Sequence, residues 1–225
     1  MQYIREQGPD IAPIFEATSV ALVGASERDG SLGTVVLKNL VEAGFEGPIY
    51  PVNPGYDTVQ GRECFSSLQD IDKPVDLAVI VTPAAAVPGV LDDCGACDVS
   101  AAVILSAGFR EAGEDGRALE QAVLDRAKRH RIRFIGPNCL GIMRPDIKLN
   151  ATFSQRMAKP EQIALVSQSG AMCTAMLDWA SPRNIGFSCV ISSGIAADVD
   201  FGEMLDYLVI DPATHAIMLY VEGIH

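Results

Sequence analysis

A strand, a turn of small residues and a helix follow one another near the start of this 225-residue chain. Residues 19–24 form a mostly apolar run, and the turn contains Gly24, Ala25 and Ser26. A polar loop then leads to Gly33, where a helix is predicted to begin. Backbone N–H groups at the start of a helix attract anions, and small residues let a phosphate approach them closely. This segment is therefore predicted to bind the phosphates of a ligand.

The end of the second predicted strand, Val52-Asn53-Pro54, argues against one common class of ligand. A site for a nicotinamide dinucleotide usually has an Asp or Glu about 20 residues after the glycine turn, where it holds the ribose hydroxyls. Asn53 stands at that place. The sequence thus favours a phosphate-bearing ligand other than NAD, and an NAD(H)-binding sensor is kept as a third alternative.

A second strand–turn–helix segment repeats the features that favour anion binding. It contains Ser167-Gln168-Ser169-Gly170, in which Ser169 and Gly170 are predicted to hold a phosphate. The alternative for Ser169 is a helix cap. Glu222 is expected to end a buried strand, where a carboxylate is costly unless it has a task. The alternative for Glu222 is a solvated strand end.

Three further residues stand at predicted strand or loop ends. Thr82 and Pro83 end the third strand, on the carboxyl edge where open α/β sheets bind ligands. Asn138, in the run Gly-Pro-Asn-Cys-Leu-Gly, either fixes a tight turn or contacts the ligand.

Cys94 and Cys97 lie at a predicted helix C-terminus, which disfavours thiolates, and no second cysteine pair has zinc spacing. No metal site is predicted.

Alternating strand and helix signals must position these residues, and they predict an α/β fold with a parallel sheet. The predicted strands are 19–24, 48–52, 76–81, 100–106, 132–135, 162–166, 187–191 and 216–220. The predicted helices are 33–44, 84–97, 115–130, 169–181 and 200–209. We expect a Rossmann-like domain over 1–141, a turn-rich, irregular linker over 142–160, and a second α/β domain over 161–225 that looks incomplete because it has only three strands.

The composition bounds the function. A formal net charge of −12 argues against nucleic acid and anionic membranes as partners. The longest apolar run, 77–91, is interrupted by Pro83 and Pro88 and is too short to span a bilayer. Six cysteines are dispersed through apolar segments, which is typical of reduced thiols. A cytoplasmic protein is expected.

Seven segments, in this order and spacing, resemble the NDP-forming acyl-CoA synthetases and the α part of succinyl-CoA synthetase. They are Val23-Gly24-Ala25-Ser26, Tyr50-Pro51-Val52-Asn53-Pro54, Ser106-Ala107-Gly108-Phe109-Arg110-Glu111, Gly136-Pro137-Asn138-Cys139-Leu140-Gly141, Leu165-Val166-Ser167-Gln168-Ser169-Gly170-Ala171, Ala197-Asp198-Val199-Asp200 and Tyr220-Val221-Glu222-Gly223. The resemblance implies a Rossmann-like CoA-binding domain followed by the first part of a flavodoxin-like ligase domain. It places coenzyme A at Gly24, Ala25, Ser26, Gly33, Val52, Asn53, Pro54, Thr82, Pro83 and Asn138.

In this family the reaction converts acyl-CoA, phosphate and ADP into acid, CoA and ATP, through an acyl phosphate and a phosphohistidine. The resemblance implies that Ser169 and Gly170 hold the transferring phosphate and that Glu222 orients the histidine. That histidine lies beyond Glu222 in the family pattern, so this chain is expected to be inactive alone. ATP and ADP are expected to bind only through an ATP-grasp module, either a β-type subunit or a fused C-terminal domain; homo-oligomerisation is left open.

Two positions depart from the family pattern. Gly55 stands where the family often has Lys or Arg beside an adenosine phosphate, with Arg28 and Arg62 as candidate substitutes. Ile195 follows Gly194 where the family commonly has Asn. Both departures fit an alternative, namely a regulatory, CoA-sensing synthetase-like module of a protein lysine acetyltransferase.

Overall fold

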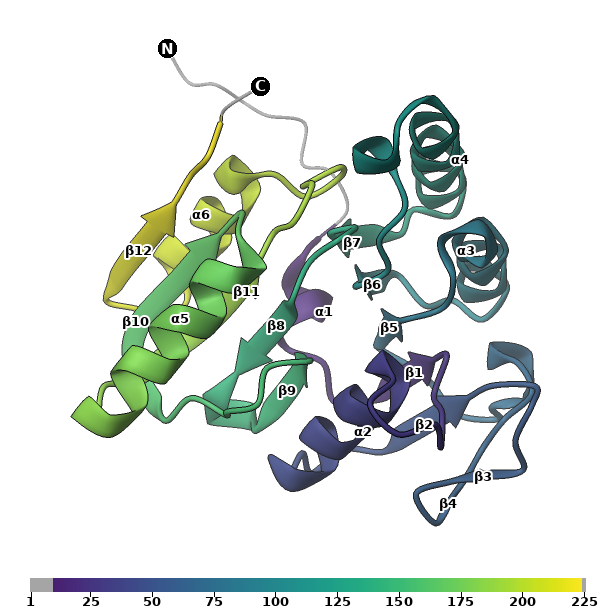
Figure 1. The fold of residues 1–225 in the computed structure, drawn as a ribbon, viewed down its shortest axis with the longest axis horizontal. Coiled ribbons are helices and arrows are strands. Elements are labelled where there is room, and N and C mark those ends of the chain that lie inside the picture. Colours follow the sequence, from purple (N-terminus) through teal and green to yellow (C-terminus); the bar gives the residue numbers. More distant parts are fainter. Residues whose placement is uncertain (1–9, 224–225) are drawn as a thin grey trace.

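The computed structural model describes residues 10–223 and contains two five-stranded sheets side by side (Figure 1). The first sheet is parallel throughout, in the order β2-β1-β5-β6-β7. Its strands are β1 (Val20–Val23), β2 (Ile49–Val52), β5 (Leu77–Ile80), β6 (Ala101–Ile104) and β7 (Arg133–Ile135). Strands β1, β5 and β6 are buried along their whole length, as their continuous apolar sequences predict. The predicted parallel α/β sheet is confirmed.

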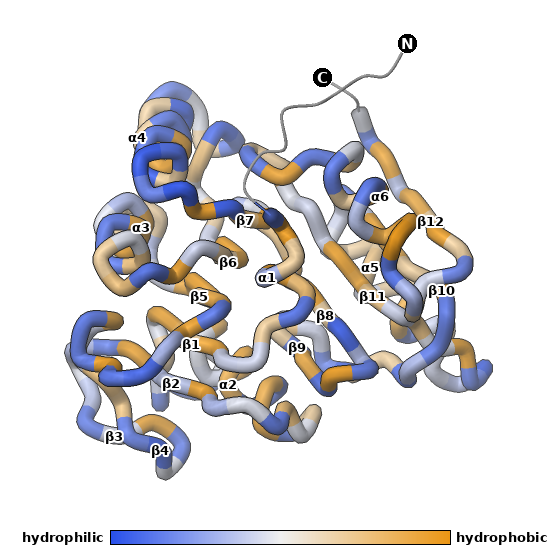
Figure 2. The backbone as a smooth tube through the Cα atoms, turned by 180° about the vertical axis from the view of Figure 1, so that it is seen from behind, coloured by the Kyte–Doolittle hydropathy of each residue, from blue (hydrophilic) through white to orange (hydrophobic). Residues whose placement is uncertain are grey.

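Helices cover both faces of this sheet. Helix α2 (Leu32–Glu42) packs on one face, and α3 (Val87–Ala96) and α4 (Glu114–His130) pack on the other. Helix α4 is hydrophilic along much of its length (Figure 2). Its first turn is acidic and its last turn is basic, which matches the helix dipole. A small hairpin of β3 (Thr58–Val59) and β4 (Arg62–Glu63) follows β2.

The second sheet has the order β12-β10-β11-β8-β9. Strands β10 (Pro160–Ser167), β11 (Phe187–Ser192) and β12 (Ala216–Tyr220) are parallel, while β8 (Gly141–Arg144) and β9 (Leu149–Thr152) run antiparallel beside β11. Helices α5 (Gly170–Ala180) and α6 (Phe201–Ile210) cover opposite faces. The predicted helices and parallel strands of this region are confirmed.

The expectation of an irregular linker over 142–160 is wrong as regards its structure. This segment contains most of a buried hairpin, β8 and β9, which extends the second sheet from three strands to five. Pro145, Asp146 and Lys148 form the tight connection, with Lys148 in the left-handed conformation, and these turn residues gave the segment its irregular appearance. The domain limits at 141 and 160 stay a prediction.

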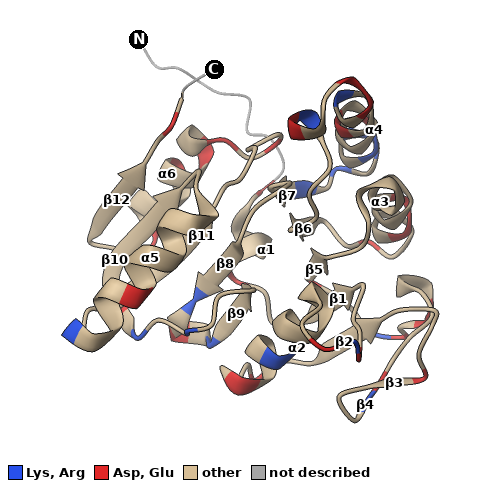
Figure 3. Ribbon diagram, in the orientation of Figure 1, with Lys and Arg blue, Asp and Glu red and all other residues tan. Residues whose placement is uncertain are grey.

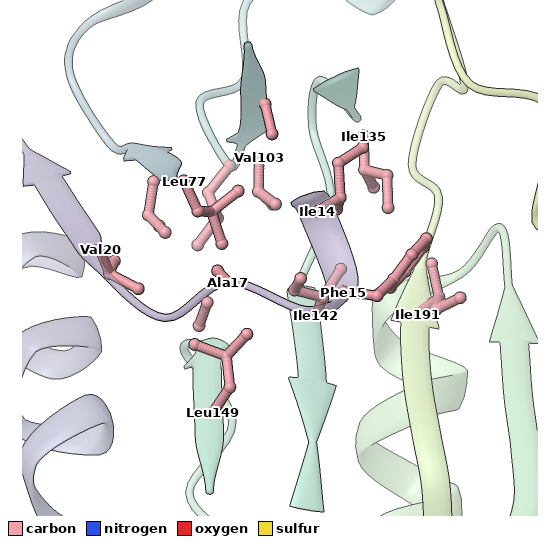
Figure 4. Close-up of a cluster of buried hydrophobic side chains, with 14 of the residues drawn as sticks. Ile14, Phe15, Ala17, Val20, Leu77, Val103, Ile135, Ile142, Leu149 and Ile191 are labelled. Atoms are coloured by element: carbon pink, nitrogen blue, oxygen red, sulfur yellow. The ribbon is translucent and has the colours of Figure 1, made fainter. Parts of the chain in front are cut away.

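A shared core holds the two sheets together. The short helix α1 (Ala12–Phe15) lies between them, with Ile14 and Phe15 fully buried (Figure 4). Phe15 stacks on Tyr207 of α6 at 4.6 Å between ring centroids. First-sheet side chains such as Val103 and second-sheet side chains such as Ile191 belong to the same apolar cluster. Each such side chain contributes about 1.5–3 kcal/mol on burial, so the two sheets keep a fixed relation.

Candidate functional site

A cavity of about 610 Å³ opens at the carboxyl ends of β1, β2 and β5. The strand order reverses between β1 and β5, and this switch point is where open α/β sheets bind ligands. Eight predicted residues form part of its wall, namely Gly24, Ser26, Gly33, Val52, Asn53, Pro54, Thr82 and Pro83. Ala25 is fully buried behind the turn and does not line the cavity. The structure therefore brings most of the first predicted site together.

Two glycines let helix α2 start directly against the strand ends. A Cβ on Gly33 would overlap the carbonyl oxygen of Gly24. Gly24 itself has φ +99°, and a Cβ there would lie 3.1 Å from the backbone nitrogen of Thr82. Both positions exclude larger residues, so the close approach of backbone segments shapes the floor of the cavity.

The N-terminus of α2 faces this cavity. Ser31 caps the helix by accepting a hydrogen bond from the Thr34 backbone N–H, and Leu32 and Gly33 of the first turn line the wall. N–H groups of a first turn have no partner within the helix and favour an anion. The Thr34 hydroxyl lies 2.6 Å from the carbonyl oxygen of Ser26, which ties the preceding loop to the helix.

Asn53 has a positioning role. Its Nδ2 donates to the carbonyl oxygen of Ala25 at 2.7 Å, and its Oδ1 accepts from the Gly55 backbone N–H at 2.8 Å. An Asp at this position could not donate the bond to Ala25. Asn53 thus fixes the turn of Gly24, Ala25 and Ser26 against the end of β2, which gives a physical reason for an amide where a nicotinamide site would have a carboxylate.

The charges in the wall are few. Among the described residues that line it, Arg28 is the one Lys or Arg and Asp93 the one carboxylate. Arg28 is therefore the one wall residue with a positively charged side chain, while Arg62 and Gly55 lie outside the wall. Of the two candidate substitutes for a cation at Gly55, the structure places only Arg28 at the cavity.

Sequence reasoning missed one side of the cavity. Ser66, Ser67 and Leu68 line it because β2 is bridged at Val52 to Phe65 after the small hairpin. Ser67 and Asp70 form a capping box, a local signal that the sequence did carry. The bridge to Phe65 is tertiary, so the sequence could locate this turn but not the surface that it faces.

The ends of β5, β6 and β7 lead from this cavity toward the second sheet. The Ser106 hydroxyl donates to the carbonyl oxygen of Thr82 at 2.5 Å, and the backbone N–H of Asn138 donates to the carbonyl oxygen of Ser106 at 2.9 Å. Asn138 is exposed, has φ +54° and does not line the cavity. A Cβ on Gly170 would lie 3.2 Å from Cβ of Leu140, so the loop after β7 borders the second turn.

The second turn is built by serine hydroxyls. Ser169 caps α5 by accepting from the Met172 backbone N–H at 3.3 Å. Ser167 Oγ donates to the carbonyl oxygen of Ser169 and accepts from its N–H. The capping role considered for Ser169 is thus present, and the α5 N-terminus lies at the carboxyl edge because α5 directly follows the end of β10. Phosphate binding at Ser169 and Gly170 stays a prediction.

Glu222 does not end a buried strand. Its side chain is exposed, and β12 is an edge strand whose residues are exposed or half-buried. The expectation was wrong because an apolar sequence does not reveal whether a strand lies at the edge of a sheet. Gln168 holds this segment beside the second turn, since its Oε1 accepts from the backbone N–H groups of Glu222 and Gly223.

The cysteines do not form a reactive pair. Burial raises the pKa of the Cys94 thiol to about 12, and it raises that of Cys139 to the same value. Cys97, three residues after Cys94, also has a raised pKa, through burial and the neighbouring Asp93 and Asp98 carboxylates. These thiols stay protonated at neutral pH and are poor nucleophiles.

Comparison with known proteins decides the family. Residues 18–145 match the family model of the CoA binding domain, and residues 160–225 match that of the succinyl-CoA ligase-like flavodoxin domain. The chain belongs to the CoA-binding domain family. Its resemblance to NDP-forming acyl-CoA synthetases is also confirmed by its relatives. None of the helices within residues 10–223 is both long and apolar enough to cross a membrane.

Three relatives of this CoA-binding domain protein illustrate the match. The ADP-forming acetate–CoA ligase of Methanocaldococcus jannaschii is 46% identical, over 92% of this chain and 29% of its own length. The α subunit of ADP-forming acetate–CoA ligase I of Pyrococcus furiosus is 42% identical, over 94% of this chain and 46% of its own. A dinucleotide-forming acetyl-coenzyme A synthetase 1 of Ca. Korarchaeum cryptofilum, solved with phosphate and ADP, superposes with a TM-score of 0.92 at 38% identity, over 96% of this chain and 46% of its own. The chain thus spans less than half the length of each.

Proposed function

We propose that this chain is the CoA-binding, α-type portion of an NDP-forming acyl-CoA synthetase. The observation that carries the proposal is the cavity at the switch point of the first sheet, where the α2 N-terminus and Arg28 face the same space. The family match over residues 18–145 and relatives named as ADP-forming acetate–CoA ligases support it. The complete protein would convert acyl-CoA, phosphate and ADP into acid, CoA and ATP.

Within the cavity, the first-turn N–H groups of Leu32 and Gly33 would bind the pyrophosphate, assisted by the Arg28 guanidinium. Apolar wall residues such as Val52 and Leu68 would contact the adenine. The ends of β5, β6 and β7, at Thr82, Ser106 and Asn138, would then guide the thiol arm toward the second turn, because backbone and hydroxyl hydrogen bonds connect these ends in series.

At the second turn, Ser169 and Gly170 would bind the transferring phosphate at the α5 N-terminus. Glu222, held nearby by Gln168, would accept a hydrogen bond from the phosphorylated histidine and orient it. That histidine, and the ATP-grasp module that binds ADP or ATP, belong to other parts of the complete enzyme. A relative named as an α subunit supports a separate β-type subunit, and a relative of more than three times this chain's matched length supports a fused arrangement.

A second candidate function is a regulatory, CoA-sensing module of a protein lysine acetyltransferase. Two observations favour it. Ile195, where the synthetases commonly have Asn, is half-buried against the apolar cluster between the first sheet and helices α3 and α4, and its side chain offers no polar group. Gly55 offers no cation at the end of β2. A module with this role would bind CoA and carry no phosphoryl transfer.

Calorimetric titration of the 225-residue chain with CoA, and in parallel with NAD, tests the CoA-binding function. We expect saturable heat with CoA and none with NAD, because the wall has no carboxylate at Asn53 to hold the nicotinamide ribose. Binding of NAD in place of CoA would overturn the proposal. Transfer of phosphate between acyl-CoA and ADP by a complex with a β-type subunit would distinguish the synthetase from the regulatory module.

Substitution of the cavity cation gives a sharper test. Arg28→Gln is expected to weaken CoA binding about tenfold, because a charge-assisted bond to phosphate is lost. Arg62→Gln removes the same charge from β4, outside the cavity wall, and should leave the affinity unchanged. Equal effects of the two substitutions would show that only the overall charge of the protein matters.

A further inference from the structure

One hydroxyl at the cavity has no partner. Thr82 Oγ1 is buried and makes no hydrogen bond, and within residues 10–223 it is the one buried side-chain nitrogen or oxygen of which this is true. Leaving a buried polar group unpaired destabilises a protein, so native structures rarely contain one without a function. The carbonyl oxygen of the same residue does have a partner, since it accepts a hydrogen bond from the Ser106 hydroxyl at 2.5 Å.

The place of Thr82 is set by the fold. It follows β5 at the switch point and lies in the cavity wall beside Gly24 of the phosphate turn. On its other side come Ser106 and Asn138, at the ends of β6 and β7, and then the second turn. Thr82 therefore stands between the N-terminus of α2, which favours phosphates, and the edge that leads to Ser169.

The order of groups in CoA can be compared with this layout. Its pyrophosphate is joined to the thiol by a pantetheine arm that contains two amide groups. With the pyrophosphate at the α2 N-terminus and the thiol directed toward the second turn, the arm must cross the end of β5. A threonine hydroxyl both donates and accepts, and it changes direction by moving between staggered χ1 positions. It can therefore accept a hydrogen bond from the N–H of an amide or donate one to its carbonyl oxygen.

We propose that the Thr82 hydroxyl hydrogen-bonds to a pantetheine amide of bound CoA and so makes the cavity select ligands that carry this arm. The inference rests on the proposed CoA-binding function and adds a specificity-determining residue to it. The unpartnered hydroxyl destabilises the free protein, and the bound ligand satisfies it. The Thr82 hydroxyl consequently increases the affinity for CoA but lowers the stability of the free chain.

The test is the isosteric substitution Thr82→Val, with two ligands titrated calorimetrically into the full chain. CoA affinity is expected to fall about fivefold, the size of one neutral hydrogen bond. Affinity for adenosine 3′,5′-bisphosphate, which lacks the pantetheine arm, should be unchanged. The melting temperature of the free variant should rise, because the unpaired hydroxyl is gone. Thr82→Ser keeps the hydroxyl and should retain the parental preference for CoA.

A matched control removes a hydroxyl that has a partner. Thr18 Oγ1 donates to Asp76 at 2.6 Å, near the start of β1 and outside the cavity wall. Thr18→Val should lower the melting temperature and leave CoA affinity unchanged.

Unchanged CoA affinity in Thr82→Val, or an equal loss for both ligands, would overturn the role of Thr82 while leaving CoA binding intact. Absence of CoA binding by the parent chain would instead overturn the proposed function, and the inference with it.

Discussion

The two sheets differ in how many charged and buried polar residues they contain. In the first sheet, β1, β5 and β6 carry no charged residue and the edge strand β7 carries Arg133, whereas β8 of the second sheet carries Arg144 (Figure 3). Most buried polar residues of the described part of the chain also belong to the second sheet and its connections. They are Arg144, Asn150, Thr152, Ser154, Ser167, Ser188, Ser192, Ser193 and Asp211.

This difference has a consequence for each site. At the first site the apolar strands are closely packed, and the close approach of Gly24 and Gly33 shapes the cavity. The site is therefore most sensitive to an increase in side-chain volume. At the second, side-chain hydrogen bonds position the turn after β10 and the segment after β12, so loss of a polar group is the sensitive change there. The buried Arg144–Asp211 ion pair lies at the opposite ends of the same parallel strands, where protonation is the sensitive change. Substitutions that add volume should break the first site, and those that remove a polar group should break the second.

The largest effect is expected for Gly33→Ala. The added methyl group would overlap the carbonyl oxygen of Gly24. Because this oxygen belongs to the backbone and cannot rotate away like a side chain, α2 must shift away from β1. We expect a loss of about 3 kcal/mol in the free energy of unfolding, and loss of CoA binding. Urea unfolding and CoA titration measure both. Gly89→Ala, in α3 with nothing within 4 Å of the new Cβ, is the control and should be neutral or slightly stabilising.

The next effect concerns the buried ion pair of the second sheet. Arg144 Nη1 donates to Asp211 Oδ2 at 2.8 Å. Burial raises the pKa of Asp211, but the hydrogen bonds from Arg144 and Thr214 outweigh it and hold that pKa below its usual value. Because the folded-state pKa is lowered, the stability that Asp211 contributes is present above about pH 4 and is lost as the pH falls below it.

Asp211→Asn is therefore expected to cost about 2 kcal/mol at pH 7, since Arg144 keeps Asp146 as a partner. The variant should also lose less stability than the parent between neutral pH and about pH 3. Urea unfolding across this range measures both effects. Asp178→Asn, in an exposed pair with Arg156, is the control and should change little. A parallel acid response in the parent and Asp211→Asn would contradict the assignment.

The smallest global effect is expected for Gln168→Ala. This substitution removes the acceptor for the Glu222 and Gly223 N–H groups, which lie at an exposed edge. Global stability should fall by less than about 1 kcal/mol, while amide hydrogen exchange at 220–223 should accelerate clearly. Gln121→Ala, which removes an exposed bond to Asp125 on α4, should leave exchange in 220–223 unchanged. CoA affinity should not change in either variant.

Local patterns predicted much of this protein. The apolar runs of β1, β5 and β6, the small residues Gly24 and Gly33 and the alternation of strands with helices led to the first sheet and to the turn that lines the cavity. They failed at the β8–β9 hairpin, where turn residues concealed two short strands, and at Glu222, where an edge strand looked like a central one. Both failures concern strand pairing: the hairpin itself is local, but its place in the sheet depends on the pairing of β8 with the distant β11, and the exposure of β12 depends on its pairing with β10 at the sheet edge.

By itself, the sequence determined the class of fold, the two anion-favouring turns and the absence of a carboxylate at Asn53, because each depends on residues close together in the chain. Only the tertiary structure decided that Arg28 rather than Arg62 faces the cavity, that Asn53 fixes the turn, and that Thr82 keeps an unpaired hydroxyl. These facts depend on strand order and on the packing of loops from separate strands, which no local pattern encodes.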